Sequence, residues 1–302
     1  MPPKLSVVLP VWNGEKYIAE AVESVLRQTF AHFELLVIDD GSTDATAAIL
    51  ASYDDPRIKI HRLAHGGIVQ ALNFGVAQSQ AEWIARQDAD DRSLPERFAM
   101  QWQALQEHKN AVLTFTDAAL IGEWKSRLGR ARFPRTKAFI ALRLCYQSPI
   151  IHSTVVFRKD AFRQAGGYRP EERHAEDYAL WGRMLELGEF VPVPQPLLEF
   201  RVHPASVSKH NLETQHSLTT QIASENTRRF MGLEERDARR AFETLVVPPE
   251  KRPLREWFWF ATHCLPKLRW KSAEVYGWAA WQTVRNVIPL KRTGVSLSSL
   301  SA

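Results

Sequence analysis

The chain has 302 residues, of which 45% are hydrophobic, and it carries a formal net charge of +5. This length is enough for one large α/β domain and an appendage. Two cysteines far apart in the sequence, without metal-ligand neighbours, exclude a disulfide framework and favour a reducing compartment. No window approaches the roughly 18–20 apolar residues of a spanning helix, and no apolar signal segment follows Met1, so we expect a cytoplasmic protein.

The first part of the chain alternates between apolar runs, which predict strands, and apolar residues at helical spacing, which predict helices. We expect strands at 5–9, 34–38, 58–60, 83–86 and 112–115 and helices at 15–29, 45–49 and 66–76. Short connections between such elements predict an α/β fold with a mostly parallel sheet, covered by helices on both faces.

The pattern is less regular after residue 117. We expect a basic, extended segment at 122–136, a strand at 153–157, helices at 161–165 and 176–187, and mostly helix beyond 204. These elements divide the chain into a sheet domain at 1–210 and a helical C-terminal extension at 211–302.

Two carboxylates follow the predicted strand at 83–86. Asp88 and Asp90 are one residue apart and therefore point to the same side of the chain. Such a pair suits Mg²⁺ or Mn²⁺, which bind one or two carboxylates and complete their coordination with water and substrate phosphates. Because ligands of parallel sheets bind beyond the carboxyl ends of the strands, residues 10–13 and 39–42 face the same crevice.

The common phosphate-binding motifs are absent from the sequence. No Gly-x-Gly-x-x-Gly follows the first strand, and no Gly-x-x-x-x-Gly-Lys-Ser/Thr is present. A phosphate in this crevice would instead be held through the metal.

Several motifs closely resemble those of the family 2 glycosyltransferases, which have the GT-A fold. They occur in the family's order over roughly residues 4–208 and comprise Pro10-Val11-Trp12-Asn13-Gly14, Ser24-Val25-Leu26-Arg27-Gln28-Thr29, Asp39-Asp40-Gly41-Ser42-Thr43-Asp44, Ala85-Arg86-Gln87-Asp88-Ala89-Asp90-Asp91, Gly166-Gly167-Tyr168, Glu176-Asp177-Tyr178-Ala179-Leu180-Trp181 and Arg201-Val202-His203-Pro204-Ala205-Ser206-Val207-Ser208. The resemblance implies a Rossmann-like sheet whose residues 1–117 bind the nucleotide and whose residues 118–210 bind the acceptor. It also implies a role in bacterial cell-surface polysaccharide synthesis.

The resemblance implies which residues bind the nucleotide of the donor. Asp40 matches the aspartate that recognises the base, because a carboxylate accepts the ring N–H of uracil. Pro10 and Val11 match positions that line the base. Asn13 and Ser42 lie in the same two motifs, and we assign them to the nucleotide as well.

The same comparison implies a Mn²⁺ or Mg²⁺ site. Asp88 and Asp90 match the family's Asp-x-Asp, with Asp90 as the direct metal ligand and Asp88 bound to the ribose or to a metal-bound water. His203 is either a third metal ligand or a contact to the diphosphate, and a packed histidine is the structural alternative. We expect Asp91 to cap the following helix.

Asp177 matches the family's catalytic aspartate, the general base that takes a proton from the acceptor hydroxyl. The alternative is a first-turn carboxylate that complements the helix dipole. Glu176 is expected to contact the acceptor or support Asp177. Trp181 could stack on an acceptor sugar, although an aromatic at helical spacing is also typical of a core, and His152 is structural or acceptor-side. One base and no placed nucleophile predict inversion at the anomeric carbon.

One departure from the family concerns positive charge near the nucleotide. Leu72 stands where many family members have an arginine. Arg86 lies on the same strand face as Asp88 and could supply this charge, so we assign it to nucleotide binding.

The C-terminal segment is basic and aromatic. From Glu250 to Arg292 there are nine Lys or Arg residues and three Asp or Glu residues, interleaved with tryptophan, tyrosine and phenylalanine. Such a segment predicts helices that lie on an anionic membrane surface. A helical cap on the sheet domain or an oligomer contact is the alternative, and nucleic-acid binding is disfavoured.

We therefore interpret the chain as an inverting, metal-dependent glycosyltransferase that moves a sugar from a nucleoside-diphosphate donor, with UDP favoured, to a hydroxyl of a glycan or lipid-linked acceptor at the inner face of a bacterial membrane. A nucleotide-sugar pyrophosphorylase is disfavoured because the loop at 10–13 is not rich in glycine, arginine or lysine. A catalytically silent glycan- or membrane-binding subunit is disfavoured because Asp40, Asp90 and Asp177 are all present.

Overall fold

The computed structural model describes residues 2–123, 125–203, 212–247 and 251–287. The chain forms two compact units, which we call the sheet unit and the helical unit. The sheet unit comprises Met1–Phe133 and Ile150–His203, and the helical unit comprises Pro134–Pro149 and Pro204–Ala302.

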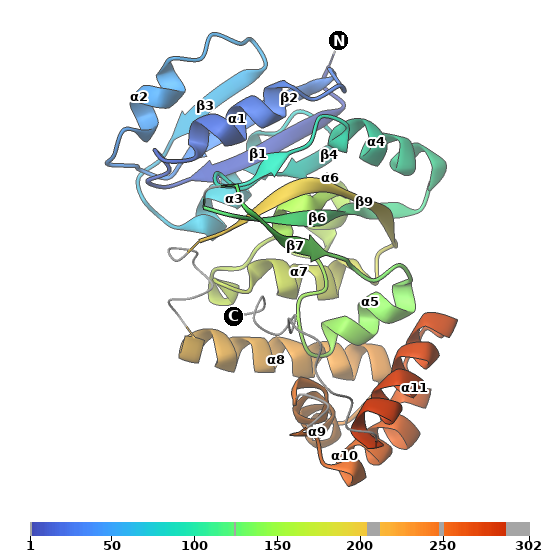
Figure 1. Cartoon of the computed structure of the whole chain (residues 1–302). Helices are drawn as coiled ribbons and strands as arrows, with labels where there is room; N and C mark the ends of the chain where they lie inside the picture. The colour runs from blue at the N-terminus through green and yellow to red at the C-terminus, as the bar shows by residue number, and fades with distance from the viewer. Residues whose placement is uncertain (1, 124, 204–211, 248–250, 288–302) are drawn as a thin grey trace. The chain divides into compact units, whose positions relative to one another are not determined.

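A mixed sheet of nine strands forms the sheet unit (Figure 1). The strands are β1 (Leu5–Val11), β2 (Phe33–Asp39), β3 (Ile58–Arg62), β4 (Trp83–Arg86), β5 (Arg92–Ser93), β6 (Ala111–Gly122), β7 (Arg127–Ala131), β8 (Val155–Arg158) and β9 (Glu189–Val202). Their order is β3-β2-β1-β4-β8-β6-β9-β5, with β7 paired to β6. The first four strands are parallel, β8 is antiparallel to both its neighbours, and β9 is parallel to β6. The α/β prediction is confirmed.

The helices of the sheet unit cover both faces of the sheet. They are α1 (Ile18–Leu26), α2 (Thr46–Ala51), α3 (Ile68–Gln78), α4 (Arg97–Glu107), α6 (Lys159–Gln164) and α7 (Glu176–Met184). Val7 and Leu9 of β1 point into one buried cluster with Ile18 of α1. Val8 points to the opposite face, where a Cβ on Gly75 of α3 would lie 2.5 Å from its methyl group. This close approach explains the glycine within α3.

Strand β9 and helix α5 (Lys137–Leu144) are two of the elements in the first 203 residues that were not predicted. Strand β9 is one of the longest in the sheet, but Pro192, Pro194 and Pro196 interrupt its apolar pattern. Proline cannot donate to a strand ladder, and the β6–β9 register accordingly shifts near Asp117. Helix α5 directly follows the segment at 122–136 that was expected to be extended, and the Thr136 side chain caps it by accepting from the Phe139 N–H.

The helical unit combines α5 with α8 (Leu212–Met231), α9 (Glu235–Val246), α10 (Leu254–Trp259) and α11 (Ala273–Val287). Trp257 and Phe260 are fully buried in it, and the Trp278 ring packs 6.1 Å from that of Phe139. Part of the predicted membrane-facing aromatic set therefore forms a core. Phe258 and Trp281 remain about half exposed.

Two points bear on the predicted C-terminal extension. The predicted boundary at 210 lies outside the described residues, and the structure adds 134–149 to the C-terminal helices. In the described part of the chain, no helix combines the length and apolar character needed to cross a membrane.

Candidate active site

The loops after β1 and β2 interlock at the carboxyl edge of the sheet. The Asp40 N–H donates to the Val11 carbonyl at 2.8 Å, and the Asn13 N–H donates to the Ser42 hydroxyl at 2.9 Å. In return, the Asn13 side-chain oxygen accepts from the Thr43 N–H at 2.8 Å. Asn13 adopts a positive φ of 52°, which asparagine tolerates better than most residues. These polar side chains fix the loop geometry, and their assignment to the nucleotide stays a prediction.

Asp40 lies between this loop pair and the start of α3. Its two carboxylate oxygens accept from the Gly66 and Gly67 N–H groups at 2.9 and 2.8 Å. His65 lies against the same carboxylate, and the Trp12 ring stacks on His65 with centroids 4.5 Å apart. Trp12 is 55% exposed, so one wide face of its ring is open to solvent.

Arg86 and Asp88 form an ion pair at the end of β4. Arg86 Nη2 lies 2.5 Å from Asp88 Oδ1, and the arginine is only 3% exposed. Its Nε and Nη1 atoms are buried without a hydrogen-bond partner among the described residues. Buried N–H donors without a partner lower the stability of the folded protein, and an oxygen atom of a bound ligand that accepted from them would offset this loss.

The loop that carries Asp88 and Asp90 rests on a fully buried arginine. Arg97 donates to the Arg86 carbonyl at 2.8 Å, to the Ser93 hydroxyl at 2.8 Å and to the Gln87 side chain at 3.1 Å. The Gln87 amide in turn donates to the Asp88 and Asp91 carbonyls. Burial lowers the pKa of Arg97 to about 9.

The expectation for Asp91 is wrong. Helix α4 begins at Arg97, where no side chain caps it. Buried Asp91 instead accepts from the Ser153 hydroxyl and, at 2.9 Å, from the Arg201 N–H. The Asp91 carboxylate thereby ties the loop that carries Asp88 and Asp90 to β9.

Asp90 and His203 are in direct contact at the same edge. Asp90 Oδ2 lies 2.9 Å from His203 Nε2, and the Asp90 side chain is 37% exposed. Among the described residues, no group of three potential ligands gathers into a metal site, so Asp88, Asp90 and His203 do not form a closed cage. An exposed carboxylate with an adjacent imidazole nevertheless fits a Mg²⁺ or Mn²⁺ ion that keeps water and phosphate ligands.

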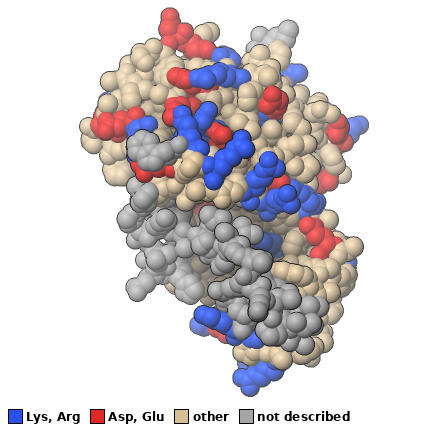
Figure 2. Space-filling model, in the orientation of Figure 1, with Lys and Arg blue, Asp and Glu red and all other residues tan. Residues whose placement is uncertain are grey.

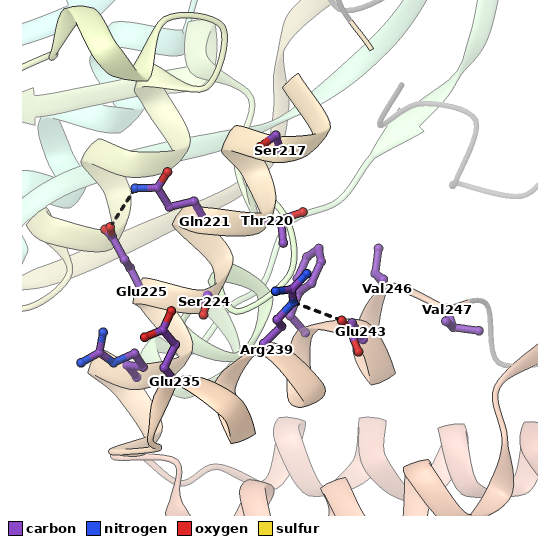
Figure 3. Close-up of a pocket in the computed structure, with 12 residues that line it drawn as sticks. Ser217, Thr220, Gln221, Ser224, Glu225, Glu235, Arg239, Glu243, Val246 and Val247 are labelled. Carbon is purple, nitrogen blue, oxygen red and sulfur yellow. Dashed lines mark hydrogen bonds and ion pairs between the residues drawn. The ribbon is translucent and has the colours of Figure 1, made fainter. Parts of the chain in front are cut away.

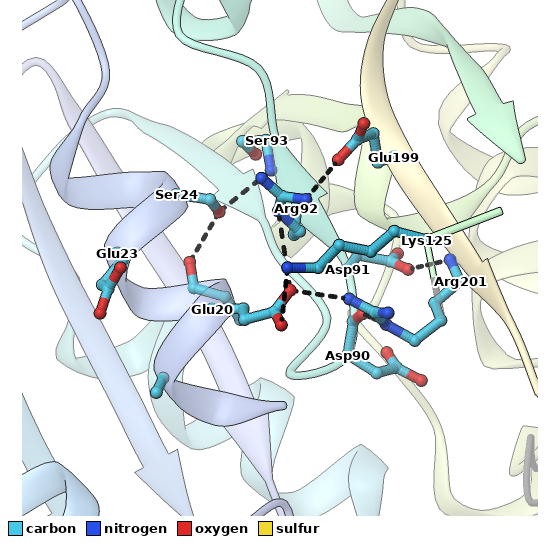
Figure 4. Close-up of polar contacts among 12 residues, drawn as sticks. Glu20, Glu23, Ser24, Asp90, Asp91, Arg92, Ser93, Lys125, Glu199 and Arg201 are labelled. Carbon is cyan, nitrogen blue, oxygen red and sulfur yellow. Dashed lines mark hydrogen bonds and ion pairs between the residues drawn. The ribbon is translucent and has the colours of Figure 1, made fainter. Parts of the chain in front are cut away.

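A cluster of opposite charges borders this site (Figure 4). The Glu20 carboxylate of α1 lies 3.1 Å from Lys125 and 3.1 Å from Arg201, with Arg92 at 3.8 Å. Arg201 also donates to the Asp90 carbonyl at 2.9 Å. The β6–β7 turn and the end of β9 are thereby fastened to α1, which fixes the position of the Asp90 backbone.

Asp177 and Glu176 open helix α7. Burial and, to a lesser extent, the Glu176 carboxylate raise the pKa of Asp177 to about 7, against the lowering effects of the Tyr178 N–H and Arg86. The Tyr178 N–H donates to Asp177 at 2.6 Å. Burial also raises the pKa of Glu176, which accepts from the His174 N–H at 2.7 Å. Asp177 is thus a half-buried carboxylate able to exchange protons near neutral pH.

The assignment of Trp181 to acceptor stacking is wrong in this structure. Trp181 is fully buried and packs against Phe157 and the edge of His152. No face of its ring is open to a sugar. His152 bonds to the Tyr168 hydroxyl at 2.7 Å, and burial lowers the pKa of His152 well below its usual value. A neutral, bonded imidazole supports the structural alternative for His152.

Sequence reasoning missed the Trp12–His65 stack and the Arg97 network. The position of Trp12 was a usable signal, because it directly follows a strand of the parallel sheet, where ligands bind. Arg97 gave no such signal, because its contacts come from residues 4 to 58 positions away along the chain.

A separate groove of about 820 Å³ lies between α8 and α9 of the helical unit (Figure 3). Its polar side chains are bonded locally, Gln221 to Glu225 and Arg239 to Glu243. None of the predicted site residues lines it, and we assign no ligand to it.

The fold and the carboxyl-edge site belong to a known class of protein. The model of "Glycosyl transferase family 2" matches residues 6–166. The chain therefore belongs to this family and is a glycosyltransferase.

Individual relatives extend this result. A "Putative glycosyltransferase EpsE" of Bacillus subtilis is 34% identical over 62% of this chain and 68% of that protein. The "O-antigen biosynthesis glycosyltransferase WbnJ" of Escherichia coli is 30% identical over 69% and 83%. The "Amylovoran biosynthesis glycosyltransferase AmsE" of Erwinia amylovora is 30% identical over 68% and 78%.

Solved structures share the GT-A-like fold. The S. aureus TarS fragment 1–349, in complex with UDP-GlcNAc, aligns with a TM-score of 0.64 at 19% identity, covering 94% of this chain and 89% of that one. The mannosyltransferase PcManGT from Pyrobaculum calidifontis, in complex with GDP-Man and Mn²⁺, covers 95% of this chain with a TM-score of 0.58 at 13% identity.

Proposed function

We propose that this glycosyltransferase is an inverting, metal-dependent enzyme that moves a sugar from a nucleoside-diphosphate donor, preferably a UDP-sugar, to a hydroxyl of a glycan or lipid-linked acceptor. The observation that carries the proposal is that Asp177, in the first turn of α7, lies near enough to Arg86 and Asp88 for their charges to act on its pKa, and Asp88 is two residues from the Asp90–His203 contact. A carboxylate with a pKa of about 7 therefore lies within reach of the same edge as Asp90. A base and a metal-binding carboxylate on one edge are what transfer from a diphosphate requires.

Three side chains support nucleotide binding. The open face of Trp12, backed by His65, offers a stacking surface for a base. Asp40 Oδ1 accepts from the Gly66 N–H and retains a second lone pair for a ring N–H, whereas Oδ2 accepts from the Gly67 N–H and also lies 2.9 Å from His65 Nδ1. TarS and PcManGT, whose complexes hold UDP-GlcNAc and GDP-Man, are consistent with a nucleotide-sugar donor.

Asp90 and His203 would hold the divalent ion, with Asp88 beside them. When bound, the ion supplies positive charge that stabilises the diphosphate leaving group. Arg201 fixes the Asp90 backbone, and Arg97 fixes the loop through Gln87. These contacts position the ligands before any substrate arrives, which favours tight binding of the transition state.

Asp177 would take the acceptor proton. The acceptor oxygen attacks the anomeric carbon, the bond from that carbon to the phosphate oxygen breaks, and the nucleoside diphosphate leaves with the electron pair. The hydroxyl proton passes to Asp177. A single displacement inverts the anomeric centre, so an α-linked donor should give a β-linked product by proton NMR.

The acceptor class rests on the relatives. WbnJ and AmsE are named for O-antigen and amylovoran biosynthesis, which supports a cell-surface polysaccharide as the product. The exposed Phe258 and Trp281, with neighbouring basic residues, support attachment of the helical unit to the inner face of the cell membrane.

A donor screen tests the proposal. Nucleotide sugars are incubated with the protein and Mn²⁺, and release of nucleoside diphosphate is measured with and without EDTA. We expect slow metal-dependent hydrolysis of one UDP-sugar, which Asp177→Asn abolishes. Release of nucleoside triphosphate from a nucleotide sugar and pyrophosphate would indicate a pyrophosphorylase, and donor binding without turnover would indicate a silent subunit.

A further inference from the structure

A row of unpaired arginines runs along the edge strand β7. The segment Lys125–Arg132 holds four basic residues and no acidic residue. Lys125 pairs with Glu20, but the side chains of Arg127, Arg130 and Arg132 are exposed and make no ion pair or hydrogen bond with any described residue. Figure 2 shows Lys and Arg side chains gathered over β7 on this face of the sheet unit. We call Arg127, Arg130 and Arg132 the arginine row.

The arginine row starts beside the candidate active site. Arg127 pairs with Ile121 of β6, and Ile121 pairs with Arg201 of β9. Two strand spacings, about 10 Å, therefore separate the Arg127 backbone from that of Arg201. Arg201 contacts the Asp90 carbonyl, so the row leads directly to the edge where transfer is proposed.

The backbone of β7 adds a second kind of contact. Within the described residues, β7 pairs only with β6, so one edge of the strand presents free N–H and C=O groups. Arg130 lies in β7 and Arg132 follows its last residue, Ala131, so their backbones are about 7 Å apart. Guanidinium groups bind carboxylate and phosphate, while a strand edge exchanges hydrogen bonds with hydroxyls.

From this arrangement we propose that the arginine row binds the acceptor as an anionic glycan chain, one that carries carboxylate or phosphate groups along its length. The row spans about 16 Å of extended strand, which is longer than a single diphosphate. A linear chain with repeated anionic groups and intervening hydroxyls matches both the arginines and the free strand edge. This inference rests on the proposed function in one respect only, the identification of the bound glycan as the acceptor.

Two variants with the same net charge test the inference. In the first, Arg127, Arg130 and Arg132 are all replaced by glutamine. In the matched control, Lys109, Arg163 and Arg236 are replaced by glutamine; their side chains are also exposed and make no ion pair or hydrogen bond with described residues. Unchanged thermal unfolding of both variants establishes that each is folded.

Binding is measured by fluorescence polarisation with labelled oligogalacturonate, polyphosphate and neutral dextran as probes. We expect the wild type to bind both polyanions and not dextran. The first variant should bind them about 5- to 100-fold more weakly, because exposed charge pairs each contribute a small factor. The control should stay within about twofold, and added salt should weaken wild-type binding.

Three results would overturn the inference. Equal losses in both variants would mean that only net charge matters. If the wild type binds neither polyanion, the row serves to keep sheet edges apart. If only binding to phosphatidylcholine–phosphatidylglycerol vesicles depends on the row, the surface faces a membrane. If the protein binds polyanions but hydrolyses no donor, the proposed function is refuted, whereas the proposed polyanion-binding surface is supported.

Discussion

The pH dependence of transfer should follow the ionisation of Asp177. With a pKa of about 7, roughly one Asp177 in eleven is ionised at pH 6 and ten in eleven at pH 8. If the ionised carboxylate is the base, kcat/KM should rise about tenfold over this interval. An aspartate with its ordinary pKa near 4 would give a flat profile there.

The assay is initial-rate donor hydrolysis or transfer between pH 5.5 and 8.5 at fixed Mn²⁺. The variant Glu176→Gln provides a diagnostic control, because the Glu176 charge raises the pKa of Asp177. Its rate should begin to rise at a lower pH than that of the wild type. Asp177→Asn should lose about 10²–10⁴-fold in rate at every pH.

The same pKa predicts an effect on stability. The folded-state pKa of Asp177 is raised above its unfolded value, so ionisation destabilises the folded protein as pH rises from about 4 through 7. Asp177→Asn should therefore be more stable than the wild type above pH 7, by at most about 4 kcal/mol, and equal to it below pH 4. A rate independent of pH from 5.5 to 8, together with no stability gain in Asp177→Asn at pH 8, would refute this account of Asp177.

Three further predictions address the other parts of the site. Asp90→Ala should abolish the Mn²⁺ dependence of UDP affinity in calorimetry, and His203→Ala should weaken it less; equal wild-type affinity with and without Mn²⁺ would contradict the metal assignment. Trp12→Ala should weaken UDP binding about 5- to 150-fold, since base stacking contributes about 1–3 kcal/mol; an unchanged Kd would place the base elsewhere. Arg97→Met should lower the free energy of unfolding in urea by about 2–4 kcal/mol, because it leaves buried acceptors unpaired, whereas exposed Arg163→Met should change it by less than about 0.5 kcal/mol.

The nucleotide-binding half was predictable because its signals are local. The strands at Leu5–Val11 and Phe33–Asp39 consist mostly of apolar residues, and every residue of both strands is buried. The two strands pair in parallel, with Val11 opposite Asp39, and this pairing places Asp40 beside Val11. Parallel pairing is what the alternation of strands and helices predicted. The order of the elements and the apolar periodicity were therefore sufficient to predict that the loops with Asp40 and Asp88 lie at the same edge of the sheet.

Contacts across the sheet were not predictable in the same way. Nothing in the local sequence around Asp91 indicates that its carboxylate binds Ser153 and the Arg201 backbone, 62 and 110 residues away. For Trp181, by contrast, a local pattern was present but led to a wrong prediction. Its helical spacing from Asp177 suggested a shared outward face, but the helix turns the tryptophan into the core beside Phe157.

Strand β9, which was not predicted, explains why the contact between Asp90 and His203 could not be derived from the local sequence. Its prolines conceal the strand, yet its carboxyl end delivers Arg201 to the Asp90 carbonyl and His203 to the Asp90 carboxylate. Parallel pairing with β6 is what sends that end to the same edge as β1 and β4. The β6–β7 turn then carries Glu123 and Lys125 to Lys16 and Glu20 of the neighbouring chain segment. Loss of the Glu20 cluster should therefore disturb Asp90 and the start of the arginine row together, because one turn positions both.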